Sequence, residues 1–160
     1  MQSLAEELRG IVQSALPLLN QLENSAISER PHPQKWAKKE ILGHLIDSAC
    51  NNQQKFVRMM QKPELDFPGY GQDEWVDLQN WTQANWEQML ELWQSYNMHL
   101  AHLIETIPEQ YHHHTITIEG AGPFSLKFVM EDYVEHLKHH LNQILPEAGF
   151  SSAFKNVYGA

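Results

Sequence analysis

Apolar residues recur every three or four positions along most of this chain, and that spacing predicts amphipathic helices. The first stripe covers about residues 3–25, where Pro17 is expected to kink the helix or disturb its packing. A Pro-rich connection follows at 28–34, and the next stripe predicts a second helix over about 37–61. The first third of the chain therefore predicts two long helices joined by a polar connection.

Prolines and glycines break the chain again between residues 63 and 71, and a short helical turn is expected near 72–78. Thr82 is a suitable N-cap for a third helix, which should end near residue 107, before Pro108. The middle of the chain therefore predicts one more long helix after an irregular connection.

Residues 115–119 differ from the rest, because β-branched side chains alternate there and predict a short strand. A turn should follow at 120–123, and Ser125 is a suitable cap for a fourth helix over about 126–145. Together these elements predict an all-α fold, a four-helix bundle with a short strand or hairpin element between helices 3 and 4. The long connections allow a topology other than strict up-down-up-down.

Length and composition narrow the class of protein. The 160 residues suit a single domain over 1–160, and 42% hydrophobic with 19% charged residues is ordinary for a soluble globular protein. Lys and Arg number 11 against 20 Asp and Glu, which argues against nucleic acid or an anionic membrane as a partner. No apolar run could span a membrane, no signal peptide is expected, and the lone Cys50 favours a reducing cytoplasm.

Ten histidines are the compositional oddity, and two of them form a metal-binding pattern. His136 and His140 are four residues apart in the fourth predicted helix, so about 40° separates them around its surface. Both fall on the apolar side of that helix, where ring nitrogens need a partner. Two imidazoles at this spacing can bind one metal ion, so His136 and His140 are candidate metal ligands.

A pair of imidazoles leaves a divalent ion short of ligands, because catalytic zinc-type sites commonly take three protein ligands and a water. His44 is the best candidate for the third ligand, since it lies mid-helix beside the apolar stripe of the second predicted helix. Asp47 is a candidate for orienting an imidazole by accepting its N–H. Gly43 would allow a neighbouring helix to approach closely.

Simpler explanations exist for each of these residues. His44 alone could be a partly buried, hydrogen-bonded side chain, and the His136–His140 spacing could arise by chance in a His-rich chain. All three could also form a buried polar cluster without a metal. Other histidines in the helices and loops are expected to be mainly solvent-facing: His139, His99, His102, His112, His113 and His114. Of these, His99 and His102 are close enough in the third predicted helix to pair.

Other catalytic chemistries lack their sequence motifs. The chain contains no Gly-x-Ser-x-Gly, no phosphate-binding glycine-rich loop and no Cys-x-x-Cys. The His-Glu-x-x-His motif of zinc proteases is also absent, because Leu137 follows His136. A general base is therefore not assigned by any motif.

Two helical motifs make the chain recognisable. Segment 36–48, WAKKEILGHLIDS, resembles the second-helix motif of the DinB-like family of bacterial metal-binding four-helix bundles. Segment 136–144, HLKHHLNQI, resembles the fourth-helix motif of the same family. The connection 67–76 and the segment 93–100 look like those of its YfiT-like branch. Because these pieces come in the right order, the resemblance covers nearly the whole chain.

The resemblance implies one divalent metal, held by three histidines that fall here on His44, His136 and His140. Zinc or nickel is the expected metal, with iron as an alternative. Members of the family include S-transferases that use a low-molecular-weight thiol, and proteins described as metal-dependent hydrolases; homodimers are common. The chain departs from the family at Ala37, where Ser or Thr often caps the helix.

The resemblance therefore implies a metal-dependent enzyme with a small-molecule substrate, a thiol S-transferase or a related hydrolase, with a low-molecular-weight thiol as a candidate cofactor. The alternative is a non-catalytic metal-binding or stress-related dimeric structural protein.

Overall fold

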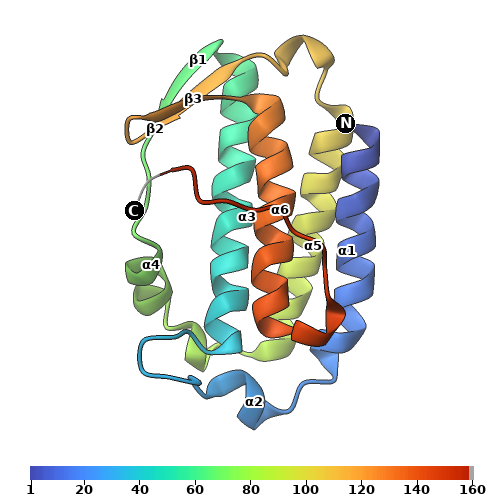
Figure 1. Cartoon of the computed structure of the whole chain (residues 1–160), viewed down its shortest axis with the longest axis vertical. Coiled ribbons are helices and arrows are strands. Elements are labelled where there is room, and N and C mark those ends of the chain that lie inside the picture. Colours follow the sequence, from blue (N-terminus) through green and yellow to red (C-terminus); the bar gives the residue numbers. More distant parts are fainter. Residues whose placement is uncertain (159–160) are drawn as a thin grey trace.

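The computed structural model describes residues 1–158 and has the four-helix bundle that the apolar periodicity predicted (Figure 1). The long helices are α1 (Gln2–Asn20), α3 (Lys38–Gln61), α5 (Trp86–Thr106) and α6 (Leu126–Ile144). Helix α1 packs mainly against α5, and α3 packs against both α5 and α6. Helices α1 and α6 run in one direction and α3 and α5 in the other, so the topology is not strict up-down-up-down.

The core lies where the apolar stripes of the four helices meet. Each helix contributes leucines that are at most 1% exposed, for example Leu8, Leu45, Leu100 and Leu137. Burying one such side chain contributes about 1.5–3 kcal/mol, so these stripes supply the main force that holds the bundle together.

The first helix is shorter than its stripe predicted. Helix α1 continues for three residues after Pro17 and ends at Asn20. Most residues after Leu19 are polar, so a continued helix would have little apolar surface to bury. A separate short helix, α2 (Asn24–Ser28), and the Pro-rich connection then carry the chain across one end of the bundle to α3 (Figure 1).

The third long helix begins at Trp86 rather than near Thr82. Its cap is Asn85, whose side-chain oxygen accepts a hydrogen bond from Gln88 N at 2.9 Å. Thr82 lies instead in a 3₁₀ turn, where its hydroxyl donates to the Asn80 side chain. The described 3₁₀ turns are η1 (Trp81–Gln83), η2 (Glu109–Tyr111) and η3 (Pro146–Ala148), and the short helix expected near 72–78 is α4 (Gln72–Gln79).

A small sheet covers the end of the bundle at which α3 ends. Its strands are β1 (Glu64–Phe67), β2 (Thr115–Ile118) and β3 (Ala121–Ser125), in the order β1-β2-β3. Strands β2 and β3 form the hairpin predicted between the third and fourth long helices, and Ser125 also caps α6 as expected. Strand β1 was not predicted, because the prolines on either side of it indicated only a break. It pairs with β2 in parallel, which needed a partner 51 residues away.

Two segments outside the bundle lie beside α3 and α6. The connection after β1 runs along α3 to α4, and the C-terminal segment 149–158 turns back along α6 (Figure 1). The hydroxyl of Tyr158 donates to Asp132 on α6 at 2.6 Å, which holds the end of this segment against the helix. Within the described residues, no helix combines the length and apolarity that crossing a membrane requires.

Candidate metal centre

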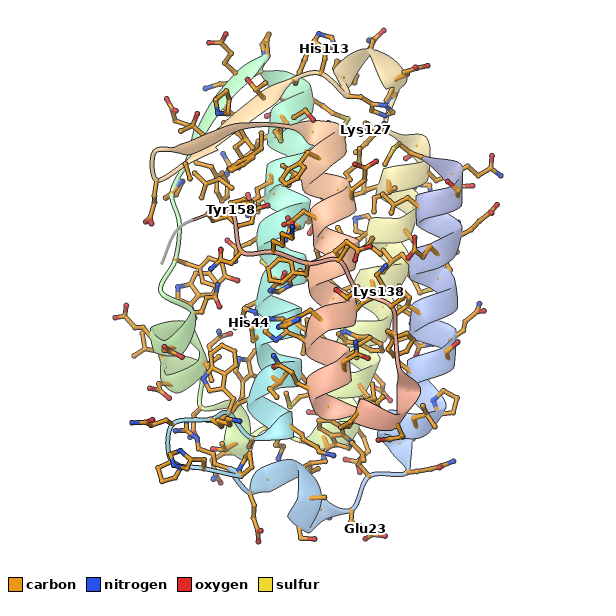
Figure 2. All side chains as sticks on the ribbon, viewed as in Figure 1. Glu23, His44, His113, Lys127, Lys138 and Tyr158 are labelled. Carbon is orange, nitrogen blue, oxygen red and sulfur yellow. The ribbon has the colours of Figure 1, made fainter. Side chains whose placement is uncertain are left out.

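Helices α3 and α6 bring three imidazoles together where they pack on each other, and Figure 2 shows His44 on α3 beside α6. His44 comes from the first two turns of α3, and His136 and His140 come from consecutive turns of α6. One ring nitrogen from each residue can be chosen so that all three atoms lie within 4.8 Å of one another. Among residues 1–158 this is the one cluster of three potential metal-binding side chains, and it is the set that the sequence predicted.

The spacing of the ring nitrogens suits one shared ion. Nε2 of His44 lies 3.2 Å from Nε2 of His136. Two imidazole nitrogens bound tetrahedrally to one metal at about 2.0–2.1 Å would be about 3.3–3.4 Å apart. The His140 ring centroid lies 4.7 Å from that of His44 and 4.4 Å from that of His136. A hydrogen bond between two imidazoles would also explain the short distance, but it gives no reason for the third ring to converge there.

The outward nitrogens of two rings have partners of the kind that orient metal ligands. Nδ1 of His136 lies 3.4 Å from the Ser48 hydroxyl, and Nδ1 of His140 lies 3.1 Å from the Gln143 side-chain oxygen. Imidazoles that bind a metal usually donate their other N–H to such a group. Nδ1 of His44 is buried and has no hydrogen-bond partner among the described residues. The donor set therefore fits a divalent cation through Nε2 atoms.

Burial keeps these imidazoles neutral. Loss of solvent, followed by the nearby His140, lowers the pKa of His44 to about 3. Burial lowers the pKa of His140 to about 4, although the Gln143 hydrogen bond opposes the shift. Burial, helped by the neighbouring histidines, also holds the pKa of His136 well below its usual value. Near neutral pH the rings are therefore in the unprotonated form that binds metal ions.

The metal-free protein is expected to be less stable at pH 5 than at pH 7. Below about pH 6.5 an unfolded imidazole gains a proton, whereas a buried one with a pKa near 3 does not, so acid favours the unfolded chain. One such residue lowers the free energy of unfolding by about 2 kcal/mol between these pH values. Urea unfolding of His44→Leu should show a pH effect smaller by about this amount, and exposed His113→Leu should match the wild type. An unchanged pH effect in His44→Leu would contradict the lowered pKa of the His44 imidazole.

A tryptophan, rather than a neighbouring helix, packs closely against Gly43. A Cβ atom at Gly43 would lie 2.3 Å from Cγ of Trp81. The Trp81 indole N–H donates to Asp47 at 3.4 Å, and the Gln79 side chain donates to the same carboxylate at 2.9 Å. Asp47 is rotated about 60° from His44 around α3, and no hydrogen bond joins it to an imidazole in the described part of the chain. Its hydrogen bonds instead fix the segment 79–81 against α3.

Gly43→Ala is expected to destabilise the protein by about 1–3 kcal/mol, because the added methyl group displaces the Trp81 ring. Gly10→Ala is the matched control, since a Cβ there meets nothing within 4 Å. That substitution should stabilise the protein by about 0.5–1 kcal/mol through helix propensity alone. Chemical denaturation of both variants tests the difference in sign, and stabilisation by both would show that Trp81 does not need the glycine.

A cavity of about 680 Å³ opens beside the imidazole cluster. His136 and His140 lie in its wall, together with Ser48 and Lys55 of α3. The connection 68–73, the tip of the β2–β3 hairpin and the C-terminal segment form walls that lie outside these two helices. None of the described lining residues is a tryptophan or a methionine. Two of the three predicted ligands, His136 and His140, therefore face a space that a small molecule could enter.

The ionisable residues of this cavity that the sequence reasoning missed include Lys55, Asp132 and Tyr158. Asp132 precedes His136 by four residues and Lys55 follows His44 by eleven, so both return to nearly the same helix face as a predicted ligand. Helical spacing would have identified these two residues. Tyr158 lies in a segment without regular structure, and no periodicity could have pointed to it.

The environment of the cavity shifts the ionisation of these groups. Burial raises the pKa of Asp132 above its usual value, while the hydrogen bond from Tyr158 opposes that shift. Burial lowers the pKa of Lys55 to about 8, while Asp132 opposes the change. The pKa of Tyr158 is raised, mainly by burial, so its hydroxyl remains a hydrogen-bond donor near neutral pH.

Histidines on the outer faces of the helices lie outside the cluster. His139 is exposed, as its rotation of about 100° from His140 predicted. His99 and His102 are both exposed, with ring centroids 6.5 Å apart. The described structure therefore draws none of these three into the group that could hold an ion.

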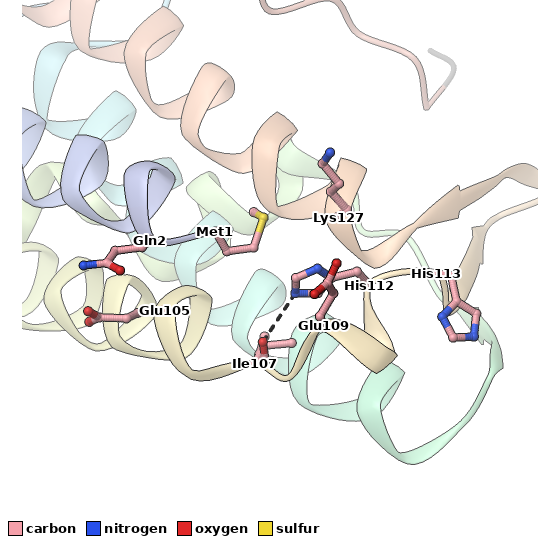
Figure 3. A pocket seen from close by; sticks show the side chains of 8 residues that line it. All are labelled: Met1, Gln2, Glu105, Ile107, Glu109, His112, His113 and Lys127. Atoms are coloured by element: carbon pink, nitrogen blue, oxygen red, sulfur yellow. Dashed lines mark hydrogen bonds between the residues drawn. The ribbon is translucent and has the colours of Figure 1, made fainter.

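The histidine tract 112–114 lies toward the other end of the bundle from His44, as the position of His113 shows (Figure 2). A more open hollow of about 520 Å³ adjoins it, where Nε2 of His112 lies 3.3 Å from the Ile107 carbonyl oxygen (Figure 3). His113 is exposed as predicted, but His112 and His114 are half-buried. Nδ1 of His114 lies 2.6 Å from the Met59 carbonyl oxygen, so this ring helps join the tract to α3.

Comparison with known proteins places this fold. A search of the curated proteins finds no match. Among solved structures, YfiT from Bacillus subtilis is similar, with a TM-score of 0.81 and 18% identity over 93% of this chain and 87% of that one. YfiT is described as a probable metal-dependent hydrolase with an unusual four-helix bundle topology, and at this identity the likeness shows the fold. The family model of the DinB superfamily matches residues 7–144, which include all three clustered histidines, and the chain therefore belongs to the DinB superfamily.

Proposed function

We propose that this protein is a metal-dependent enzyme for a small-molecule substrate, with one divalent cation held by His44, His136 and His140. The observation that carries the proposal is the convergence of three neutral imidazoles, two of which lie in the wall of a cavity of about 680 Å³. That volume lies within the range of about 300–1,000 Å³ that is usual for small-molecule sites. A divalent ion in such a site lowers the pKa of a bound water or thiol, and so supplies a nucleophile near neutral pH.

Residues around the cluster would accept the proton and position the group that accepts it. Asp132 presents a carboxylate to the cavity one helical turn from His136, where it could accept the proton that the nucleophile loses. Its raised pKa lets it take up a proton at a less acidic pH than an exposed aspartate would. The Tyr158 hydroxyl, which donates to Oδ2, would hold this carboxylate in place.

Two reactions use such a site: transfer of a low-molecular-weight thiol to an electrophile, and hydrolysis of an ester or related acyl group. The resemblance to the DinB-like family, whose members include thiol S-transferases, favours thiol transfer slightly. The description of YfiT as a probable metal-dependent hydrolase favours hydrolysis. Zinc or nickel remains the expected metal, with iron as the alternative, and the homodimer and cytoplasmic location remain predictions.

A non-catalytic metal-binding or stress-related dimeric protein is the alternative. That function would need no substrate cavity, and a cluster sealed by tryptophan or methionine side chains would support it. No such side chain lines the described cavity. The open wall beside His136 and His140 therefore supports an enzyme over a structural protein.

The experiment is an activity screen of metal-loaded protein with low-molecular-weight thiols and a chromogenic electrophile, and separately with activated esters. We expect turnover that disappears on chelation and in His136→Ala but survives in exposed His113→Ala. Metal-loaded wild type without turnover on either panel would instead support the non-catalytic alternative.

A further inference from the structure

We propose that Lys55 binds a carboxylate of the substrate, so that the site takes small molecules with an anionic group at one end and the reacting group at the other. This inference rests on the proposed function, because it assigns the reacting end to the histidine cluster.

The position of Lys55 along α3 separates its ammonium from that cluster. Lys55 lines the same cavity as His136 and His140. It lies three turns beyond His44 on nearly the same face of α3, and its long side chain leans back toward the N-terminal end of the helix. The ammonium and the cluster are thus roughly 10 Å, or about two helical turns, apart. A substrate with a chain of about eight connected atoms, joined by about seven bonds at about 1.3 Å of length each, would span most of that distance.

The ammonium of Lys55 is withdrawn from water without a close anionic partner. Lys55 is half-buried, and among the described residues it makes no hydrogen bond or ion pair; the charge that acts on it is that of Asp132. It lies instead over two aromatic rings, 5.9 Å from the centroid of Phe67 and 5.6 Å from that of Tyr158. A partly desolvated cation gains most from an anion that brings a charge-assisted hydrogen bond, and a substrate carboxylate would supply one.

Asp132 does not already fill this role. It attracts Lys55 electrostatically, but its Oδ2 atom is engaged by the Tyr158 hydroxyl at 2.6 Å, and the pair does not come within ion-pair distance. Lys55 is also the one lysine or arginine among the described lining residues, against the acidic Asp73, Glu119 and Asp132. A single cation in a wall with three acids suits a monoanionic carboxylate better than a dianionic phosphate.

The test compares 6-mercaptohexanoate with 6-mercaptohexanamide, which share length and thiol but differ in charge. Calorimetric titration of zinc-loaded wild type should show the carboxylate binding at least about tenfold more tightly than the amide. Lys55→Met should remove this preference while keeping the aliphatic stem. Lys62→Met, at an exposed lysine just after α3, is the control and should retain it. Circular dichroism checks the fold, and Lys55→Gln replaces the methionine variant if that variant does not fold.

A second arm separates this inference from the metal assignment. Hexanoate and hexanamide are titrated into metal-free protein at constant ionic strength, and NMR chemical shifts report binding in the cavity. A carboxylate preference that depends on Lys55 in either arm supports the inference, even if the protein binds no metal or turns over no substrate. Absence of that preference from both arms overturns it. Tighter binding of hexyl phosphate than of hexanoate would overturn the choice of a carboxylate.

Discussion

Zinc affinity is expected to fall by at least about 100-fold when His44 is replaced by alanine. Loss of a group that merely orients a ligand already costs about 10- to 100-fold in metal affinity, and loss of a ligand itself should cost more. Competition with a chromogenic chelator measures the affinity, on protein purified without a histidine tag. His99→Ala is the matched control, because His99 is also a helical histidine but is exposed on α5 and lies outside the cluster and the cavity wall. Its affinity should equal that of the wild type.

The paired substitution of His136 and His140 extends the same test. Elemental analysis of this variant should find no bound divalent metal, since His44 alone cannot retain one. Unchanged metal content in the double variant would show that the three-histidine assignment is wrong. Wild-type protein that binds no divalent metal at all would support the simpler interpretation, a buried cluster of imidazoles that hydrogen-bond to one another.

Phe56→Ala is expected to lower the free energy of unfolding by about 3–5 kcal/mol, the range for a large aromatic side chain removed from a packed core. Phe56 is 0% exposed and lies edge-on to Tyr133 of α6, with ring centroids 6.2 Å apart. Its neighbour Val57 is 36% exposed, so Val57→Ala should cost less than about 1 kcal/mol. Urea denaturation of both variants without metal provides the comparison.

Equal losses in the two variants would contradict the assigned orientation of α3. The same experiment bears on the site, because Tyr133 also lines the cavity and donates to Asn97 at 2.6 Å. Loss of Phe56 should therefore loosen the packing of α3 on α6, which is the interface that brings His44 to the other two imidazoles.

The bundle was predictable because its long helices carry strong apolar periodicity. The helix boundaries were less predictable, because they depend on local hydrogen bonds. For example, Asn85 rather than Thr82 caps α5. Strand β1 (Glu64–Phe67) could not be found from its own four residues, because it exists through its pairing with β2 (Thr115–Ile118). Local periodicity does not contain information about such distant partners.

The histidine cluster was predictable to a different degree for each member. The spacing of His136 and His140 places both on one helix face. The assignment of His44 as the third ligand rested on its mid-helix position together with the family resemblance. The cavity beyond them was not predictable, because its walls come from α3, α6, the connection 68–73, the β2–β3 hairpin and the C-terminal segment. The contact between Gly43 and Trp81 was missed for the same reason, since 38 residues separate the two.

X-ray absorption at the zinc edge of the zinc-loaded protein tests the metal centre most directly. The predicted spectrum contains three imidazole nitrogens at about 2.0–2.1 Å and a further light donor, with two imidazoles left in His44→Ala. A sulfur donor from Cys50, or the same imidazole number with and without His44, would show that the ion is bound elsewhere.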